Sequence, residues 1–206
     1  MKKSAEFRSL EIKGLECRAK DGTAGELTGY AVVYEQLSEE LGMFTKFREK
    51  IARGAFGDSI QGDIRALWSH EEDSVLGRTK SGTLRLKDDE IGINFSLDLP
   101  DNTLGRDAFV TISRGDVTGM SFGFMVVEDE WVISADGTSA VRSIKSAQLF
   151  EISPVAFPAY SQTVVDTRDL KSLEAAASAA LSQRIAVPAS SYFLLKNLQL
   201  DEALDR

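Results

Sequence analysis

Apolar and polar residues alternate along most of the chain up to about residue 160, which is the pattern of half-buried β-strands. Residues 6–12, 27–34 and 64–70 are short, apolar-rich runs, and a polar turn signal separates the first two. The clearest hairpin spans residues 83–99, where apolar residues recur at every second position on both sides of the polar run 87–90. The pattern therefore predicts a fold made mostly of strands.

Two helices interrupt the predicted strands. Residues 52–60 are a short helix candidate with glycines around it. A second helix is expected to begin at a polar cap within residues 101–103 and to end at Arg114-Gly115. Its predicted buried face carries Leu104, Ala108, Phe109 and Ile112.

Alternation returns over residues 119–127, where Ser121 and Gly123 share the face opposite to the apolar residues. Further strands are expected at 131–133 and 141–157. Because proline has no N–H to donate, we expect the chain to leave regular pairing at the prolines of segment 153–158.

Composition divides the chain into two parts. Residues 170–184 are alanine-rich with a helical pattern, and residues 192–204 form an amphipathic helix candidate after Pro188. We therefore predict one catalytic domain over residues 1–168 and an appended helical tail over residues 169–206.

The chain has 206 residues, a hydrophobic content of 43% and a charged content of 27%, which are typical of a globular protein in water. The net charge of -8 argues against direct binding to nucleic acid by charge alone. No run approaches the roughly 18 apolar residues of a membrane span, and the N-terminus lacks the apolar stretch of a secretory signal. The single cysteine, Cys17, excludes an internal disulfide.

The sequence contains one histidine, so any imidazole chemistry must use His70. A zinc site built from several Cys and His side chains is excluded by the same count. His70 precedes three carboxylates, Glu71, Glu72 and Asp73, and this run is open to three interpretations: a solvated turn, part of a metal site, or a catalytic base with its neighbours.

The second candidate is Ser121, in the run Gly119-Met120-Ser121-Phe122-Gly123. This run matches the nucleophile elbow of α/β-hydrolases, but that fold places the histidine after the serine and a helix directly after the elbow. Neither holds here, so we reject that fold. A serine preceded by its histidine is still chemically sound, because a catalytic triad is defined by geometry and not by chain order. Ser121 as an ordinary strand serine, and Glu151 as an ordinary solvent-facing residue, stay open.

Five segments in order resemble the prohead proteases of HK97-like tailed phages. They are residues 27–34, 49–56, 66–71 with the Gly77-Arg78 step after it, 117–124 and 149–160. The resemblance implies an α+β fold with a mostly antiparallel, β-barrel-like core surrounded by helices, as in herpesvirus maturation proteases. It also implies that His70 and Ser121 are catalytic. Glu151 is our candidate for the group that orients His70, with Glu72 and Asp73 as rivals; no cofactor and no metal are expected.

The function implied by the resemblance is that of a serine endopeptidase in prohead maturation. The expected partners are the major capsid protein with its scaffolding segment, the chain itself as a second substrate, and further copies in a homodimer or higher oligomer. No nucleic acid and no membrane is expected as a partner. The expected location is the prohead interior, assembled in the bacterial host cytoplasm. Two alternatives stay open: a catalytically silent assembly protein of the same fold, and an esterase using the same Ser-His pair.

Overall fold

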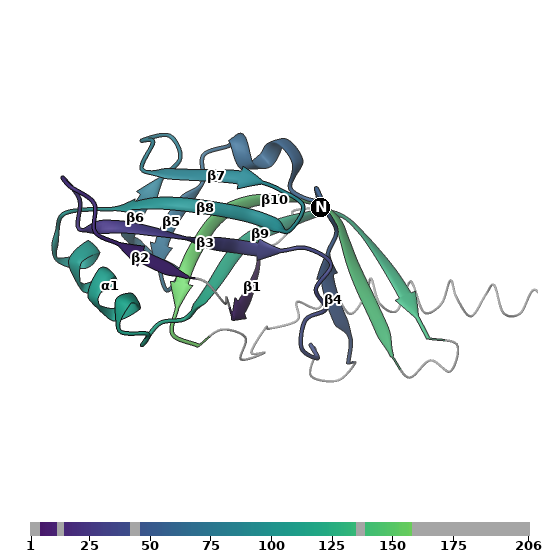
Figure 1. Ribbon diagram of the computed structural model, residues 1–206. Helices are drawn as coiled ribbons and strands as arrows, with labels where there is room; N and C mark the ends of the chain where they lie inside the picture. The colour runs from purple at the N-terminus through teal and green to yellow at the C-terminus, as the bar shows by residue number, and fades with distance from the viewer. Residues whose placement is uncertain (1–4, 12–14, 42–45, 135–138, 158–206) are drawn as a thin grey trace, which may run out of the picture.

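The computed structural model describes residues 5–11, 15–41, 46–134 and 139–157 (Figure 1). Within these ranges the chain forms ten strands, one α-helix and one short 3₁₀ turn. The elements are β1 (Glu6–Glu11), β2 (Glu16–Arg18), β3 (Gly25–Val33), β4 (Arg48–Ile51), η1 (Gly57–Gln61), β5 (Arg65–Trp68), β6 (Glu71–Arg78), β7 (Leu84–Asp88), β8 (Gly92–Leu99), α1 (Thr103–Ser113), β9 (Gly119–Ile133) and β10 (Ala140–Val155).

The strands form two sheets, which lie one in front of the other in Figure 1. The larger sheet has the order β1-β9-β10-β5-β6, and β4 pairs in parallel with the N-terminal part of β10. The smaller sheet has the order β2-β3-β8-β7. One hydrophobic core draws buried residues from both sheets, among them Leu27, Phe95 and Leu97 from the smaller sheet and Phe122, Phe124 and Ile152 from the larger one. The two sheets therefore pack face to face.

The long strand β9 shows how alternation builds this core. Met120, Phe122 and Phe124 are fully or almost fully buried and belong to the hydrophobic core that the two sheets share. The residues between them point to the opposite face, because successive side chains of a strand alternate. The strands expected at 119–127 and 131–133 are one continuous element, β9.

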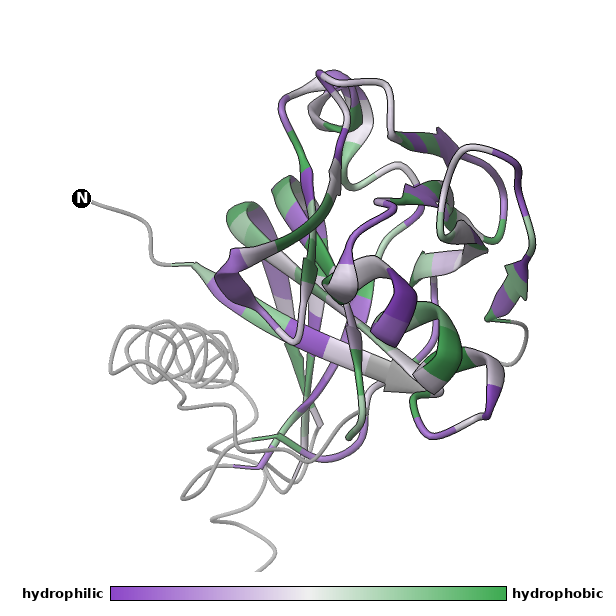
Figure 2. Ribbon diagram, turned by 90° about the vertical axis from the view of Figure 1, so that its left-hand side faces the viewer, coloured by the Kyte–Doolittle hydropathy of each residue, from purple (hydrophilic) through white to green (hydrophobic). Residues whose placement is uncertain are grey.

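Helix α1 agrees with the prediction at both ends. The Asn102 side chain accepts a hydrogen bond from the Gly105 N–H at 2.8 Å and so caps the first turn. Gly115 follows the last turn with φ of +80°, a left-handed conformation that favours glycine. Ala108 and Ile112 are buried, and Figure 2 shows both hydrophobic and hydrophilic segments on the strands and helix.

The fold class is α+β and strand-rich, but two details of the expectation were wrong. The described residues contain one α-helix rather than a surrounding set, and the two sheets do not close into a barrel. The helix expected at 52–60 is a turn followed by the 3₁₀ segment η1. Gly54 and Gly57 have φ of +70° and +41°, which an α-helix does not accommodate. The likeness to a herpesvirus protease stays a prediction.

Pairing also continues through Pro154, contrary to expectation. Pro154 lies opposite Met120 in the β9–β10 ladder, and the strand ends at Val155. The Pro154 carbonyl accepts a hydrogen bond from the Ser69 N–H at 3.2 Å, on the side away from β9. Because the N–H and C=O of one strand residue point to the same side, the missing N–H of Pro154 costs the β9 ladder nothing. Pro158 lies outside the described residues.

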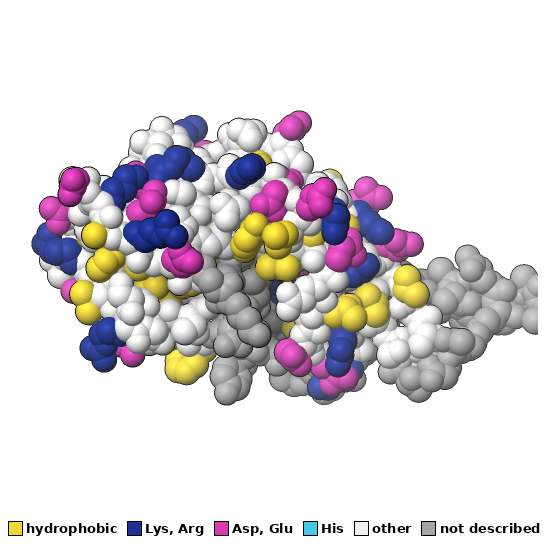
Figure 3. Space-filling model, in the orientation of Figure 1, with side chains coloured by type: hydrophobic (Ala, Val, Ile, Leu, Met, Phe, Trp, Pro, Cys, Tyr) yellow, Lys and Arg dark blue, Asp and Glu magenta, His cyan; other side chains and the backbone are white. Residues whose placement is uncertain are grey.

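The boundary near residue 168 and the helices expected at 170–184 and 192–204 also lie outside the described ranges. In the part of the chain that is described, no helix is long and apolar enough to cross a membrane. The face of the molecule in Figure 3 carries acidic and basic side chains close together. That face therefore presents no extended surface of one charge.

A cluster of five charges, with Glu49 and Arg142 buried at its centre, fastens β1 to the rest of the larger sheet. The Arg8 guanidinium contacts Glu49 at 2.7 Å, and the Arg142 guanidinium contacts Glu49 at 3.0 Å. Glu6 joins Arg142 at 2.8 Å, and Asp129 joins Arg142 at 2.7 Å. Burial alone would lower the pKa of Arg142, but the carboxylates of Glu49 and Glu6 raise it well above its ordinary value. Arg142 is therefore a permanent cation that holds β1, β4, β9 and β10 together.

Replacing Arg142 with methionine is expected to lower the free energy of unfolding by about 3–5 kcal/mol, because one partner of a buried ion cluster leaves uncompensated charges behind. Urea denaturation followed by circular dichroism measures the loss. The matched control is Arg114→Met on a side chain that is mostly exposed, where we expect a change below about 0.5 kcal/mol. Equal stability of the two variants would contradict a structural role for the cluster.

Candidate active site

His70 lies in a strained hairpin turn between β5 and β6. Trp68 pairs with Glu71, so the connecting loop consists of Ser69 and His70 alone. Both residues have positive φ, +52° and +67°. A two-residue type I′ turn requires this conformation and normally uses asparagine and glycine. Non-glycine residues held there each cost roughly 1–3 kcal/mol, and such strain is concentrated at functional sites.

The imidazole of His70 is held by a carboxylate on the neighbouring strand. Its Nδ1 lies 2.7 Å from Oε1 of Glu151, which is only 3% exposed on β10. An ionised carboxylate can only accept a hydrogen bond, so in this contact Nδ1 carries the hydrogen and donates it. Nε2 is then left as an acceptor, which is the form a general base needs.

Gly123 makes room for this carboxylate. It lies opposite Glu151 in the β9–β10 ladder, and a Cβ atom there would approach Oε1 of Glu151 to 2.8 Å. The same atom would meet the Phe150 ring at 2.6 Å. A side chain at position 123 would therefore displace Glu151. This close approach explains why a glycine stands two residues after Ser121.

Ser153 completes the surroundings of Glu151. Its hydroxyl donates to Oε2 of Glu151 at 2.7 Å and accepts from the His70 backbone N–H at 3.2 Å. Both oxygens of the buried carboxylate thus have a partner, and the strained His70 backbone is fastened to β10. Sequence reasoning missed Ser153; its signal was the spacing of two from Glu151, which places both side chains on one face of a strand.

Ser121 lies on the same face of the sheet as these groups. It pairs with Ser153 on β10, just as Gly123 pairs with Glu151, and directly opposite partners share a face. Its other neighbour is Ser9 on β1. The Ser121 side chain is 0% exposed, and its hydroxyl donates to the main-chain carbonyl of Arg8 at 3.0 Å. The strand register therefore gathers His70, Ser121 and Glu151 in one region, but the hydroxyl hydrogen of Ser121 points to β1.

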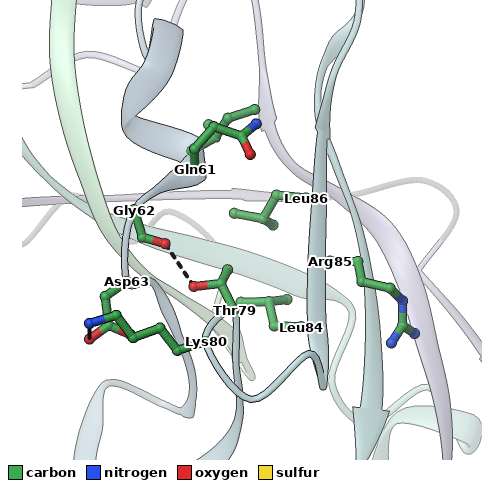
Figure 4. Close-up of a pocket in the computed structure, with 9 residues that line it drawn as sticks. Gln61, Gly62, Asp63, Thr79, Lys80, Leu84, Arg85 and Leu86 are labelled. Atoms are coloured by element: carbon green, nitrogen blue, oxygen red, sulfur yellow. Dashed lines mark hydrogen bonds and ion pairs between the residues drawn. The ribbon is translucent and has the colours of Figure 1, made fainter.

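The rival acids do not share this arrangement. Glu72 and Asp73 are exposed on β6, while the His70 ring faces Glu151. In the described ranges no group of three or more His, Cys, Asp or Glu side chains could hold a metal ion. A separate pocket between η1 and β7 is lined by Gln61, Gly62, Asp63, Thr79, Leu84 and their neighbours (Figure 4). None of the three candidate residues lines it.

Comparisons with known proteins identify the family of this chain. The family model described as "Caudovirus prohead serine protease" matches residues 13–177. A relative described as "Prohead protease", from Enterobacteria phage HK97, is 30% identical over 166 residues. The match covers 78% of this chain and 65% of the relative, so the chain spans about two thirds of that protein's length. No solved structure matches the chain. On the extent of the family match, this chain belongs to the caudovirus prohead serine protease family.

Proposed function

We propose that this chain is a serine endopeptidase that cleaves capsid or scaffold segments during prohead maturation. The observation that carries the proposal is the chain of contacts Ser153–Glu151–His70, built on the same face of β9 and β10 as Ser121. Such an arrangement supplies a nucleophile, a base in the correct tautomer and a buried group that orients it. The family model adds that relatives are serine proteases.

In the proposed mechanism, Ser121 Oγ attacks the carbonyl carbon of the scissile peptide bond and Nε2 of His70 takes the hydroxyl proton. Glu151 stabilises the resulting imidazolium through the Nδ1–H. When the C–N bond breaks, His70 gives that proton to the leaving amine. Water then attacks the acyl-enzyme ester while His70 accepts its proton. His70 passes that proton to Ser121 Oγ as the ester bond breaks, which releases the acid product and free Ser121.

The Ser153→Ala variant tests the support that Glu151 receives. Because the carboxylate oxygen Oε2 loses its hydrogen-bond donor, we expect kcat to fall roughly tenfold. That loss equals about 1.4 kcal/mol, which lies within the cost of about 1–3 kcal/mol for a buried acceptor left unpaired. Peptidase assays over a range of substrate concentrations separate kcat from KM. The conservative Ser153→Thr variant keeps the hydroxyl and should restore most of the activity, whereas a purely structural role would lower the folded fraction and leave kcat per folded molecule unchanged.

The substrates and partners extend this proposal. The major capsid protein with its scaffolding segment is the first substrate, and the chain itself is the second. Residues 1–168 are proposed as the catalytic unit and residues 169–206 as a segment for packaging or self-cleavage. The proposed place of action is the interior of the prohead in the bacterial host. The proposal requires no contact with nucleic acid or membrane. It includes a homodimer or higher oligomer of the chain.

Co-expression of this chain with its major capsid protein tests the proposal directly. Intact mass should show a capsid fragment with the unchanged chain and full-length capsid protein with Ser121→Ala. The same fragment with both chains would remove Ser121 from the site. Full-length capsid protein with both would favour a silent assembly protein, and hydrolysis of a p-nitrophenyl ester without any capsid cleavage would favour the esterase alternative.

A further inference from the structure

Strand β1 covers the candidate active site. Its six residues Glu6–Glu11 pair antiparallel with Phe124–Gly119 of β9 without interruption. The Phe7 ring lies edge-on against the His70 ring, with 4.9 Å between centroids, and is itself 42% exposed. Ser121, in contrast, is 0% exposed. A protein substrate therefore cannot reach Ser121 while β1 is in place.

The hydroxyl of Ser121 is held by the main chain of β1. A hydroxyl has one hydrogen, and the hydrogen of Ser121 is donated to the Arg8 carbonyl oxygen, 3.0 Å away. That hydrogen cannot at the same time be donated to His70. While β1 is in place, Ser121 therefore cannot pass its proton to His70, and β1 has to move before the proposed reaction can start.

We propose that the outer edge of β9 is the substrate-binding edge, and that β1 occupies it as an internal strand which an extended substrate segment with a basic residue at the Arg8 position replaces. This inference rests on the proposed function, because it names where and how the substrate of that site docks. Strand addition to a sheet edge supplies affinity through main-chain hydrogen bonds, while side-chain pockets supply selectivity.

The buried charges define the chemistry of the incoming segment. Arg8 contacts both oxygens of Glu49, at 2.7 and 3.0 Å, and its guanidinium lies 5.6 Å from the centroid of the Phe124 ring. Removal of β1 takes away Glu6 and Arg8 together. The cluster has one more carboxylate than guanidinium groups both with β1 and without it, but without β1 Glu49 loses the two contacts from Arg8. A buried carboxylate that has lost a guanidinium partner favours a segment that brings a cation to the place of Arg8.

The topology allows such an exchange. Among the described residues β1 is an edge strand that pairs with β9 alone, so within that part of the chain its release breaks a single ladder. β1 also lies before residue 13, the first residue that the family model matches. The family match therefore says nothing about β1, and its position comes from the structure of this chain alone. Leaving and rebinding of β1 would make Ser121 accessible without any change in β9 or β10.

Peptide binding to the full chain tests the inference. Arg8→Glu places a third carboxylate beside Glu49 and should release β1. A fluorescein-labelled peptide copying residues 5–11 is titrated against this variant by fluorescence anisotropy, with Ser121→Ala present in every protein so that no peptide is consumed. We expect binding at least about tenfold tighter than to the chain with native β1, because a tethered strand competes at an effective concentration in roughly the millimolar range. The peptide that itself carries Arg8→Glu should bind at least about tenfold more weakly.

One control variant tests whether the peptide binds at β9, and another variant replaces Arg8→Glu if that one does not fold. Arg18→Glu makes the same change on the exposed strand β2 and should leave peptide binding as weak as with native β1. If Arg8→Glu does not fold, Phe7→Ala replaces it, because that ring is partly exposed and its loss leaves no buried charge. Hydrogen exchange of residues 119–124 should rise when β1 is released and fall again when the peptide is added.

Equal binding of the two peptides, or unchanged exchange at residues 119–124 in a folded variant, would overturn the inference. The readout is independent of catalysis. A protein that binds the peptide at β9 and cleaves nothing fails the proposed function alone. A protein that cleaves capsid protein and binds the peptide elsewhere, or with no preference for the cation, fails this inference alone.

Discussion

The Ser121→Ala and His70→Ala variants are each expected to lose about a millionfold in kcat, and the double variant is expected to lose no more than either single one. The two side chains act in one event, because the serine is a poor nucleophile until the imidazole takes its proton. Removing the second partner therefore removes nothing that still functions. Any rate of these variants above the uncatalysed rate in water would come from substrate binding and oxyanion stabilisation alone.

Single-turnover cleavage of a capsid-derived peptide, followed by mass spectrometry, covers the required range of rates. Circular dichroism melting curves check that the variants are folded. We expect both to fold, because Ser121→Ala removes no charge and because Glu151 keeps the hydrogen bond from Ser153 in the His70 variant. Losses that add in the double variant would show that the two residues act in separate steps, and a His70→Ala loss below about tenfold would remove the imidazole from the reaction.

The strand that carries the nucleophile could be predicted because its signal is local. Alternation over residues 119–127 placed Ser121 opposite the apolar face, and the structure has Met120, Phe122 and Phe124 buried there. The hairpin at 83–99 and helix α1 were predicted for the same reason, since period and caps are read from neighbouring residues. The single histidine left no choice of imidazole.

What the sequence could not predict depends on contacts between distant segments. The β1–β9 pairing joins residues more than a hundred positions apart, and nothing local in residues 6–11 indicates that they cover Ser121. The Ser69-His70 turn has none of the glycine or asparagine that marks a type I′ hairpin, so tertiary contacts from Ser153 and Glu151 must hold it. The barrel expectation came from the resemblance and not from any residue pattern.

The Glu151→Gln variant is expected to fold and to lose about ten-thousandfold in kcat, because it favours the wrong tautomer of His70. Oε2 of Glu151 accepts from the Ser153 hydroxyl, and that hydroxyl in turn accepts from the His70 N–H. In glutamine the oxygen that accepts from Ser153 is the amide carbonyl, so the NH₂ group faces Nδ1 of His70. Nδ1 must then accept a hydrogen bond, which puts the ring proton on Nε2, where it blocks uptake of the serine proton.

Adding Ser153→Ala to Glu151→Gln should therefore raise activity instead of lowering it further. Without the Ser153 hydroxyl, the amide is free to turn its carbonyl toward Nδ1, and the productive tautomer of His70 returns. We expect a gain of roughly tenfold over Glu151→Gln alone, although Ser153→Ala lowers kcat in the native background. Peptidase rates of the four proteins of this double-mutant cycle measure the change of sign. If Ser153→Ala lowers kcat by the same factor in both backgrounds, Ser153 does not set the orientation of residue 151. If Glu151→Gln itself retains more than about a tenth of the native rate, Glu151 is not the group that orients His70.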